Sequence, residues 1–395
     1  MNSCAIICEY NPMHLGHIYH IKKTLDDLRP DILIAIMSGN FIQRGGLSIL
    51  DKYKRAKICL ENGFDLVIEL PPQFAISSAE HFAFGAISLI NNLSIDYVSF
   101  GSECGELDPL IKMAKFLKDE PLEYRQYLKS FLNEGLPYHT CRKNALAKYL
   151  NSDDINLLNT SNNILSIEYL KNLLKLNSNT KPYTIKRKGA SYTSLDLKEE
   201  FPSASSIRNH LNLNKDIFEI KNAMTQNSFN SLLNFYNEYH YFIKNELIFP
   251  YLKYKSLTLE NKLMLLPDCS EGIHNKILKS IIKSNSLEES ILEAKSKRYT
   301  YTRISRLLSQ YFIGFENFPI KDMLNEEVTC AKILGFNDRG KYFLNKNRSN
   351  ILYSSINKNE HSKEKLLNVQ CTKAYSMINK DVDPFEDYLK HPIIF

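Results

Sequence analysis

The residues best suited to chemistry lie near the start of the chain, where three histidines follow a short apolar segment. The stretch Ile6–His20 reads IICEYNPMHLGHIYH, with histidines at positions 14, 17 and 20. Pro12 fixes its own backbone φ and disfavours helical geometry at Asn11, so we expect the apolar strand to end there in a tight turn. Residues three apart are neighbours on a helix, so the histidines would share one face of a helix that begins after this turn.

A helix that begins directly after a strand and a turn is well placed to bind an anion. Its first N–H groups have no partner within the helix, and the helix dipole favours negative charge at this end. Gly16, between His14 and His17, would let a group approach the backbone closely. The stretch therefore predicts a phosphate site at which the histidine side chains contact the anion.

Two other interpretations of these histidines remain open. They could be ordinary polar residues on a helix, although the strand, the Asn-Pro turn, the glycine and the helix start all agree with a phosphate site. His14, His17 and His20 could instead bind zinc. A structural zinc site normally has four ligands, and no cysteine or carboxylate cluster with ligand spacing accompanies them, so we expect no metal site of this kind.

The composition indicates a soluble globular protein of two or three domains. The chain has 395 residues, of which 44% are hydrophobic and 24% charged, and its net charge of +6 does not by itself predict a nucleic-acid partner. No apolar run approaches the ~20 residues that span a bilayer, and no signal peptide precedes the first strand. The eight cysteines are scattered without a CxxC pair. We therefore expect free thiols, a cytoplasmic location and no membrane partner.

Strand and helix patterns alternate over about the first 120 residues, which predicts an α/β fold with a parallel sheet. The expected strands are Cys4–Cys8, Asp31–Met37, Leu66–Leu70 and Tyr97–Phe100, and the expected helices are His14–Leu28, Asp51–Asn62 and Ser78–Asn92. In such a sheet the ligand binds at the carboxyl ends of the strands, near a switch in strand order. Loops 9–17, 38–46 and 101–103 would then meet at one crevice. No GxGxxG follows the first strand, which excludes the usual dinucleotide-binding form.

The remaining segments predict a change of architecture along the chain. Ser161–Leu173 is typical of a helix, Tyr183–Lys188 of a strand, and Pro202–Leu211 of a loop that enters a helix. After about residue 215 the strand signal fades and helical patterns take over. We expect a catalytic domain at 1–212, with a helical insertion at about 108–175, and a mainly α-helical region at 213–395.

A basic and aromatic cluster distinguishes the second region. Lys295–Leu308 reads KSKRYTYTRISRLL, and a second such cluster, Lys332–Tyr342, reads KILGFNDRGKY around an expected turn. A run of charges is usually a solvated helix face. Here the tyrosines between the charges also suit RNA, because basic side chains contact phosphates while aromatic rings stack on unpaired bases.

Several motifs resemble known families. The spacing His14-x-Gly16-His17 resembles the HxGH signature of the nucleotidyltransferase superfamily, and SASSIR at 203–208 partly resembles its ISSTxIR motif. Over nearly the whole chain the sequence is similar to the bacterial tRNA(Met) cytidine acetate ligases. The segments that carry this resemblance occur in order: CEYNPMHLGHIYHI, MSGNFIQRGG, DKYKRAKICLENGFDLVIELP, FAFGAISLI, FGSE, NNILSIEYLK, IKRKGASY, SASSIR and KRYTYTRISRLL. Met13 and Ser166 replace a phenylalanine and a glycine that are common in that family.

The resemblance implies a Rossmann-like nucleotidyltransferase domain followed by a tRNA-binding region. Members of the family activate acetate with ATP to acetyl-adenylate, and then acetylate the wobble cytidine of elongator tRNA(Met) to give 4-acetylcytidine. We therefore expect an ATP-dependent ligase with Mg²⁺ beside ATP, and with acetate and tRNA as partners. The alternatives are a small-molecule adenylyltransferase, which would be much shorter, and a non-catalytic RNA-binding protein, against which intact His14, Gly16 and His17 argue.

The resemblance also implies site residues. His14 and His17 would be catalytic. The expected ATP-binding residues are Ile7, Cys8, Glu9, Tyr10, Asn11, Pro12, Met13, His14, Leu15, Gly16, His17, Ile18, Tyr19, His20, Gly101, Asn162, Arg187 and Lys188. Without the family, Asn162 is also a candidate helix N-cap and Arg187 a solvated charge at a strand edge.

Three smaller groups complete the expected site. By position alone, the candidates for orienting acetate are Ser38, Gly39 and Asn40. The ISSTxIR-like segment suggests a second phosphate site at Ser203, Ser205 and Arg208. The expected tRNA-binding residues are Lys297, Arg298, Tyr299, Arg303 and Arg306.

Overall fold

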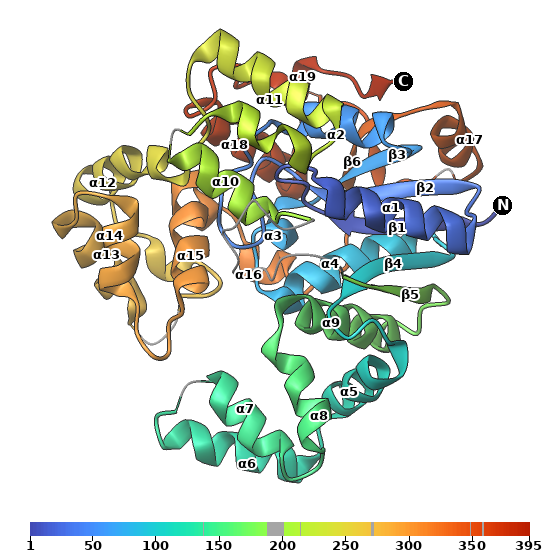
Figure 1. Cartoon of the computed structure of the whole chain (residues 1–395). Coiled ribbons are helices and arrows are strands. Elements are labelled where there is room, and N and C mark those ends of the chain that lie inside the picture. Colours follow the sequence, from blue (N-terminus) through green and yellow to red (C-terminus); the bar gives the residue numbers. More distant parts are fainter. Residues whose placement is uncertain (137, 188–200, 214, 270–271, 348, 358) are drawn as a thin grey trace.

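The computed structural model describes residues 1–136, 138–187, 201–213, 215–269, 272–347, 349–357 and 359–395. In these residues one eight-stranded sheet forms the centre of the molecule, with strand order β5-β4-β1-β2-β3-β6-β7 and β8 paired to β6 (Figure 1). The strands are β1 (Ser3–Cys8), β2 (Ile32–Ser38), β3 (Leu66–Leu70), β4 (Tyr97–Ser102), β5 (Lys181–Lys186), β6 (Ala331–Phe336), β7 (Leu352–Tyr353) and β8 (Ile393–Ile394).

The first five strands are parallel, as the alternating pattern predicts. β1 pairs with β2 on one side, where Ile7 lies opposite Ile36, and with β4 on the other, where Cys4 lies opposite Tyr97. The chain therefore builds the sheet outward from β1 in one direction to β3, and then returns to add β4 and β5 on the other side. This places the switch in strand order between β1 and β4, where ligands bind in open α/β sheets.

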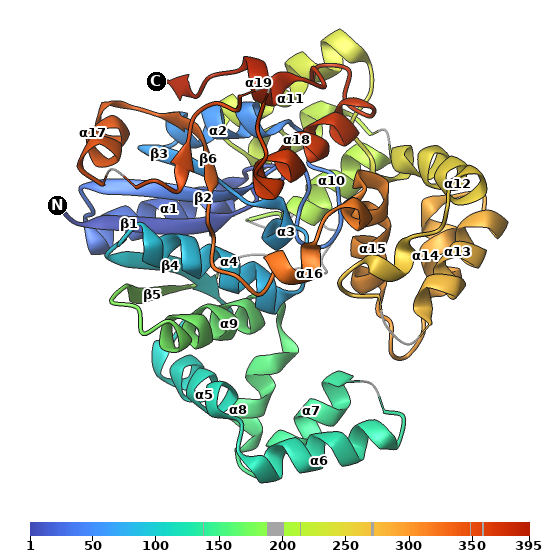
Figure 2. The ribbon, with the colours of Figure 1, turned by 180° about the vertical axis from the view of Figure 1, so that it is seen from behind.

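Helices cover the sheet and extend from it. α1 crosses in front of the sheet in Figure 1, and the same helix lies behind it in the reverse view of Figure 2. The helices of the first half are α1 (Leu15–Leu28), α2 (Lys52–Glu61), α3 (Pro72–Ala75), α4 (Ala79–Asn92), α5 (Leu107–Asp119), α6 (Leu122–Asn133), α7 (Tyr138–Leu146), α8 (Ser152–Asn156), α9 (Ser161–Lys175) and α10 (Ala204–Asn212). Between β4 and β5, helices α5–α9 form the expected helical insertion, whose α6 and α7 lie far from the sheet in both views.

The second half adds a group of helices on the opposite side of the molecule from β5. Figure 1 shows α12, α13 and α14 beside α15, at the left of the view. The helices of this half are α11 (Gln226–Tyr239), α12 (Phe249–Thr258), α13 (Ile273–Lys283), α14 (Leu287–Ala294), α15 (Tyr301–Ile313), α16 (Ile320–Met323), α17 (Asp338–Asn347), α18 (Lys363–Ser376) and α19 (Glu386–Leu389).

The C-terminal region is mainly helical, as expected, but it also contributes three strands to the sheet. β6 pairs antiparallel with β3 and carries β7 and β8, so the C-terminal part completes the sheet. The predicted basic cluster at 332–342 is therefore the strand β6 followed by α17, and the Lys332 side chain is fully buried against Asp387. β6 does not follow from local sequence rules, because its partner β3 lies far away in the sequence. The division at residue 212 stays a prediction, and the sheet continues beyond it.

The cysteines and helices agree with two simpler expectations. All eight cysteines are free thiols, and Cys4 and Cys8 are buried in β1. Burial raises the pKa of the Cys4 thiol to about 12, so this thiol stays protonated and unreactive at neutral pH. No helix in the described ranges is long and apolar enough to cross a membrane.

Candidate functional site

The site begins where β1 ends, in a turn whose shape depends on Asn11. The backbone of Tyr10 takes a left-handed φ of 46°, which ends the strand. The Asn11 amide donates to the Leu47 carbonyl at 3.0 Å and accepts from the Ile49 N–H at 2.8 Å. An amide side chain can do both at once, because its nitrogen donates while its oxygen accepts. Asn11 thereby fixes the turn after β1 to a loop about 36 residues further along the chain.

Two histidines form the N-terminal cap of α1. The Gly16 N–H donates to Nδ1 of His14 at 3.0 Å, and the His14 N–H donates to Nδ1 of His17 at 3.2 Å. This is a capping box built from imidazoles. A Cβ on Gly16 would lie 2.8 Å from Cε1 of His14, so the group that approaches this glycine is the His14 ring itself.

The cap determines what the histidines offer to a ligand. Burial, with the positive charge of Arg187 nearby, lowers the pKa of His14 to about 3 and holds the pKa of His17 well below its usual range. Both rings are therefore neutral at neutral pH. Since Nδ1 accepts a backbone hydrogen bond in each ring, Nε2 carries the proton. The two Nε2–H groups are donors suited to phosphate oxygens.

His20 has a different environment on the same helix. Its Nε2 lies 2.9 Å from the Ser99 hydroxyl, which in turn lies 2.7 Å from the Thr24 hydroxyl. Burial and Arg187 lower the pKa of His20 to about 4. His20 therefore fixes α1 to β4 at the switch in strand order.

Cationic side chains approach the histidines from β5 and α10. Arg208 donates to the Asn11 carbonyl at 2.6 Å and to the Ser205 hydroxyl at 3.2 Å, while Ser203 caps α10 by accepting the Ser206 N–H at 3.0 Å. A Cβ on Gly101 would lie 3.1 Å from Cγ of Arg187, so this glycine allows Arg187 to cross the end of β4. The predicted residue Lys188 lies outside the described residues.

The helix α9 begins at the site. Both oxygens of the Glu103 carboxylate accept hydrogen bonds there, from the Asn162 side chain at 2.7 Å and from the Asn163 N–H at 2.7 Å. Asn162 is thus not the N-cap of α9, because that position belongs to Thr160, whose side chain makes no cap hydrogen bond. Glu103 supplies the capping acceptor instead.

These residues line a common hollow at the carboxyl ends of β1 and β4. Its lining includes Ile7, Cys8, Glu9, Tyr10, Asn11, His14, His17, His20, Gly101, Asn162, Arg187, Ser203 and Arg208. Gly16 and Tyr19 line a smaller, adjoining hollow that shares the histidines and Arg187. Pro12, Met13, Leu15 and Ile18 belong to the same turn and helix but line neither hollow. Among the described lining residues Glu9 has the one carboxylate, and burial raises its pKa.

The three residues proposed to orient acetate do not line this hollow. Ser38 and Asn40 are almost fully buried, and Arg55 occupies the space beside Ser38 and Gly39 by donating to both carbonyls. We therefore correct the prediction from the 38–46 loop: Gln43 and Arg44, a few residues further on, reach the hollow instead. The sequence signal for these two residues is the QRGG segment, which is part of the resemblance.

The loop that carries Gln43 and Arg44 is held from both sides. The Gln43 N–H donates to the Glu9 carboxylate at 2.7 Å, and the hydroxyls of Ser305 and Ser309 on α15 donate to the Gly45 carbonyl at 3.2 and 2.5 Å. Gly45 has a left-handed φ of 77°, and a Cβ there would lie 2.6 Å from Cα of Arg306. A helix of the C-terminal half therefore packs directly on the back of the site.

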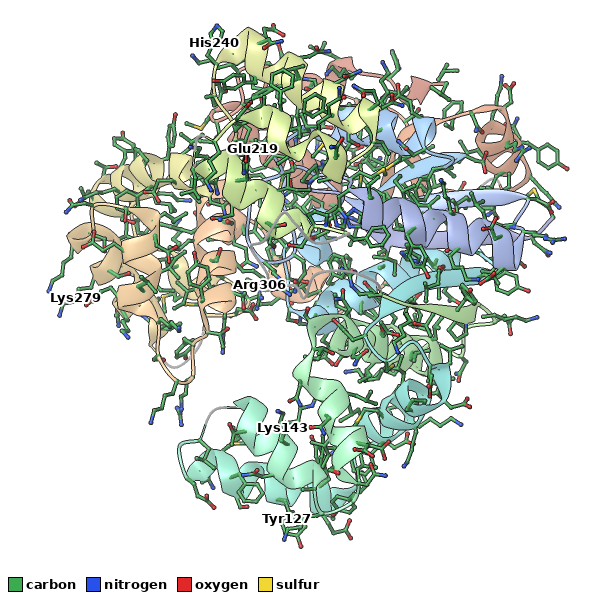
Figure 3. The ribbon with its side chains drawn as sticks, viewed as in Figure 1. Tyr127, Lys143, Glu219, His240, Lys279 and Arg306 are labelled. Carbon is green, nitrogen blue, oxygen red and sulfur yellow. The ribbon has the colours of Figure 1, made fainter. Side chains whose placement is uncertain are left out.

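The predicted tRNA-binding residues divide into two groups. Lys297 and Arg298 are exposed. Tyr299 is buried, and the Arg303 guanidinium lies 4.6 Å from its ring centroid and donates to the Asp268 carbonyl at 2.7 Å. Arg306 is 9% exposed and pairs with the Asp268 carboxylate at 3.2 Å; Figure 3 shows it where α15 meets the body of the protein. The five residues therefore do not form one solvated basic face, because both arginines at the helical spacing hold Asp268. Their role in tRNA binding stays a prediction.

Comparison with known proteins decides the family. A family model described as HIGH Nucleotidyl Transferase matches residues 1–388. The tRNA(Met) cytidine acetate ligases of Clostridium acetobutylicum and Clostridium novyi are 45% and 46% identical to this chain, and the matches cover all of it and 100% and 99% of the relatives. The chain belongs to the tRNA(Met) cytidine acetate ligase family.

Solved structures of this family share the fold along the whole chain. Thermotoga maritima TmcAL in its apo form matches with a TM-score of 0.90 at 29% identity, and both chains are covered completely. The same protein bound with alpha-thio ATP matches with a TM-score of 0.88 at 30% identity, covering 100% of this chain and 99% of that one. A family member with this fold therefore binds an ATP analogue.

Substitution of His17 tests the role of the Nε2–H donors. His17→Asn keeps an acceptor near the His14 N–H but removes the Nε2–H group, so we expect normal stability and a fall of about 10²–10³-fold in acetate-dependent pyrophosphate release. His17→Gln, whose amide can replace Nε2–H, should recover part of this loss. His391→Ala, at an exposed histidine, is the control. A normal rate in His17→Asn would contradict the assignment.

Substitution of Gly45 tests whether α15 positions the site. Gly45→Ala combines a strained left-handed backbone, which costs about 1–2 kcal/mol, with a collision against Arg306. Gly135 has the same strained φ, 78°, but no atom within 4 Å of an added Cβ, so Gly135→Ala is a matched control. We expect pyrophosphate release to fall at least tenfold in Gly45→Ala alone, at temperatures where both variants are folded by circular dichroism. Equal rates in the two variants would show that the contact is only structural.

Proposed function

We propose that this protein uses ATP to ligate acetate to a cytidine of tRNA(Met), through acetyl-adenylate. The observation that carries the proposal is the neutral two-histidine cap, flanked by Arg187 and Arg208, at the switch point of a chain that matches this family over its full length. The resemblance assigns the acceptor more finely, as the wobble cytidine of elongator tRNA(Met), with 4-acetylcytidine as the product.

In the first step an acetate oxygen attacks the α-phosphorus of ATP. A new oxygen–phosphorus bond forms, the bond to the bridging oxygen breaks, and pyrophosphate leaves with its electron pair. The enzyme mainly needs to position the reactants and neutralise phosphate charge. The Nε2–H groups of His14 and His17, with Arg187 and Arg208, would contact the phosphate oxygens.

In the second step the exocyclic amine of cytidine attacks the acetyl carbonyl. A carbon–nitrogen bond forms, AMP leaves with the electron pair of the anhydride bond, and the amine loses a proton. Because the mixed anhydride reacts with water, the hollow must exclude solvent while the RNA approaches. Gln43 and Arg44, which enter the hollow on a firmly held loop, lie on its side toward α15.

The lining of the hollow fits a magnesium ion bound together with ATP. The described residues contain no group of three or more histidine, cysteine or acidic side chains that could hold a metal. Mg²⁺ in nucleotide sites is commonly bound by one or two carboxylates and the substrate phosphates, so Glu9 would hold it. The ion would supply neutralisation of phosphate charge.

The exposed part of the basic cluster is the proposed tRNA contact. Lys297 and Arg298 precede α15, which packs on the loop of Gln43 and Arg44. Tyr299, Arg303 and Arg306 would contribute by shaping this segment rather than by contacting phosphates, because Tyr299 and Arg306 are buried and both arginines bind Asp268.

Charge reversal separates these roles. Lys297→Glu combined with Arg298→Glu should weaken tRNA binding at least tenfold and reduce its salt dependence, while acetate-dependent pyrophosphate release without RNA stays unchanged. Filter binding at several salt concentrations measures the first effect. The matched control is Lys279→Glu with Lys283→Glu, which reverses two charges on α13. Equal affinities in wild type and the 297/298 variant would place the RNA elsewhere.

One assay tests the proposed function as a whole. The protein is incubated with ATP, labelled acetate and unmodified tRNA(Met), and each component is omitted in turn. We expect pyrophosphate release that depends on acetate, and label in tRNA only when all components are present. Release driven by phosphopantetheine or nicotinamide mononucleotide instead would indicate a small-molecule adenylyltransferase. RNA binding without any release would indicate a non-catalytic RNA-binding protein.

A further inference from the structure

A second hollow lies outside the ATP site, beside α11. We call it the α11 groove; it is lined by Lys215, Asp216, Ile217, Phe218, Leu233, Tyr236, Asn237, His240, Tyr241, Phe242 and Lys244. Its volume of about 680 Å³ falls within the range of about 300–1,000 Å³ that is typical of ligand sites. Two residues labelled in Figure 3 lie near it: Glu219, from the 3₁₀ helix Ile217–Ala223, and His240, at the end of α11.

Two aromatic rings of the groove are exposed to solvent and are held in place by neighbouring rings. Tyr236 lies on Phe242 with ring centroids 4.9 Å apart and planes only 14° apart, and Phe242 is buried. One face of the Tyr236 ring therefore packs on Phe242, while 38% of the residue remains exposed to solvent. Phe218 is 58% exposed and is steadied by Phe229 at 5.8 Å. Exposed aromatic rings of fixed orientation suit planar ligands.

The polar residues of the groove favour an anionic ligand at its edge. Lys215 is exposed, and Lys244 is held beside the groove by donating to the Asn212 carbonyl at 2.9 Å. Asp216, whose carboxylate accepts the Phe218 N–H at 3.0 Å and caps the 3₁₀ helix, is the one acidic residue among the described lining residues, so the two lysines outnumber it. Aromatic rings beside lysines are the combination that binds single-stranded nucleic acid, because bases stack while phosphates pair with the cations.

The helix α10 connects this groove to the ATP site. Ser203 and Arg208, in its first turns, line the ATP hollow. At its other end, the Asn212 carbonyl binds Lys244, and Nε2 of His210 lies 2.8 Å from the Asp216 carbonyl. Four residues of helix separate Arg208 from Asn212, which is a rise of about 6 Å. The groove therefore begins about one helical turn beyond the cationic wall of the ATP site.

We propose that the α11 groove binds an unpaired base of the tRNA that lies close to the acceptor cytidine in the RNA sequence. This inference rests on the proposed function. The acceptor amine must leave base pairing to reach the acetyl group, so its neighbours along the strand are also available for stacking. Tyr236 and Phe218 stack on the base, and Lys215 and Lys244 contact its phosphates.

Removal of the rings is the first test. Tyr236→Ala and Phe218→Ala should each raise the KM for tRNA about tenfold, the effect expected for the loss of one stacked base, with little change in kcat. Tyr236→Phe keeps the ring and should behave as wild type. Tyr254→Ala removes a 65% exposed tyrosine from α12 and is the surface control. Acetate-dependent pyrophosphate release without RNA should be normal in all four variants.

Changes in the RNA identify the base. Unpaired nucleotides near the acceptor cytidine are replaced one at a time by abasic nucleotides, and each RNA is bound to wild type and to Tyr236→Ala. At one position we expect the abasic change and Tyr236→Ala together to lower the affinity for the RNA no more than either change alone. Independent losses at every position, or a normal KM in Tyr236→Ala, would overturn the proposal. Since binding is measured without ATP or acetate, this result stands apart from the test of the catalytic function.

Discussion

A buried guanidinium holds together the two strand ends on which the site is built. Arg55, on α2, is 1% exposed and donates to the carbonyls of Glu9 at 2.7 Å, Ser38 at 3.0 Å and Leu50 at 3.1 Å, and also to the Gly39 carbonyl. Backbone carbonyl oxygens therefore accept the hydrogen bonds of its guanidinium. β1 and β2 have carbonyls free for this only at their ends, where the pairing between the strands stops. The loss of such a residue would leave several buried carbonyls unpaired, each costing about 1–3 kcal/mol.

This arrangement explains which parts of the site the sequence could predict. The end of β1 at Asn11-Pro12 and the start of α1 beside His14 are local features, so the sequence predicts them. The partners of the Asn11 side chain, Leu47 and Ile49, lie 36 and 38 residues away and do not follow from local rules. Ser38 and Gly39 lie in the interior because Arg55 binds their carbonyls. No residue close to them in the sequence indicates this contact. The pairing of Arg303 and Arg306 with Asp268 does not follow from the sequence for the same reason, because Asp268 is 35 residues or more away. β6 likewise does not follow from local sequence rules, because it pairs with β3 across most of the chain.

The C-terminal half consequently does more than carry the proposed RNA surface. α15 holds the Gly45 carbonyl, and β6 brings Lys332 into a buried cluster with Lys52, Glu69 and Asp387. In that cluster Lys52 lies 3.0 Å from Glu69 and 2.7 Å from Asp387, with all these side chains at most 2% exposed. Breaking a buried ion pair costs about 3–5 kcal/mol, so the catalytic sheet and the C-terminal segments are stable only together. The candidate ATP site and the proposed RNA surface therefore share one folded unit.

The reciprocal hydrogen bonds between Glu103 and Asn163 have a consequence for the evolution of this fold. The Glu103 carboxylate accepts from the start of α9, while the Asn163 side chain accepts the N–H groups of Glu103 at 2.9 Å and Cys104 at 3.2 Å. These hydrogen bonds join the segment that leaves β4 to the start of α9. Everything between, from α5 to α8, begins and ends at the same point in space. Within that excursion α5 packs on α9 and β5 and belongs to the core, whereas α6 and α7 lie far from the sheet. We expect α6 and α7 to vary in length and sequence among relatives without altering the pairing of β4 with β5.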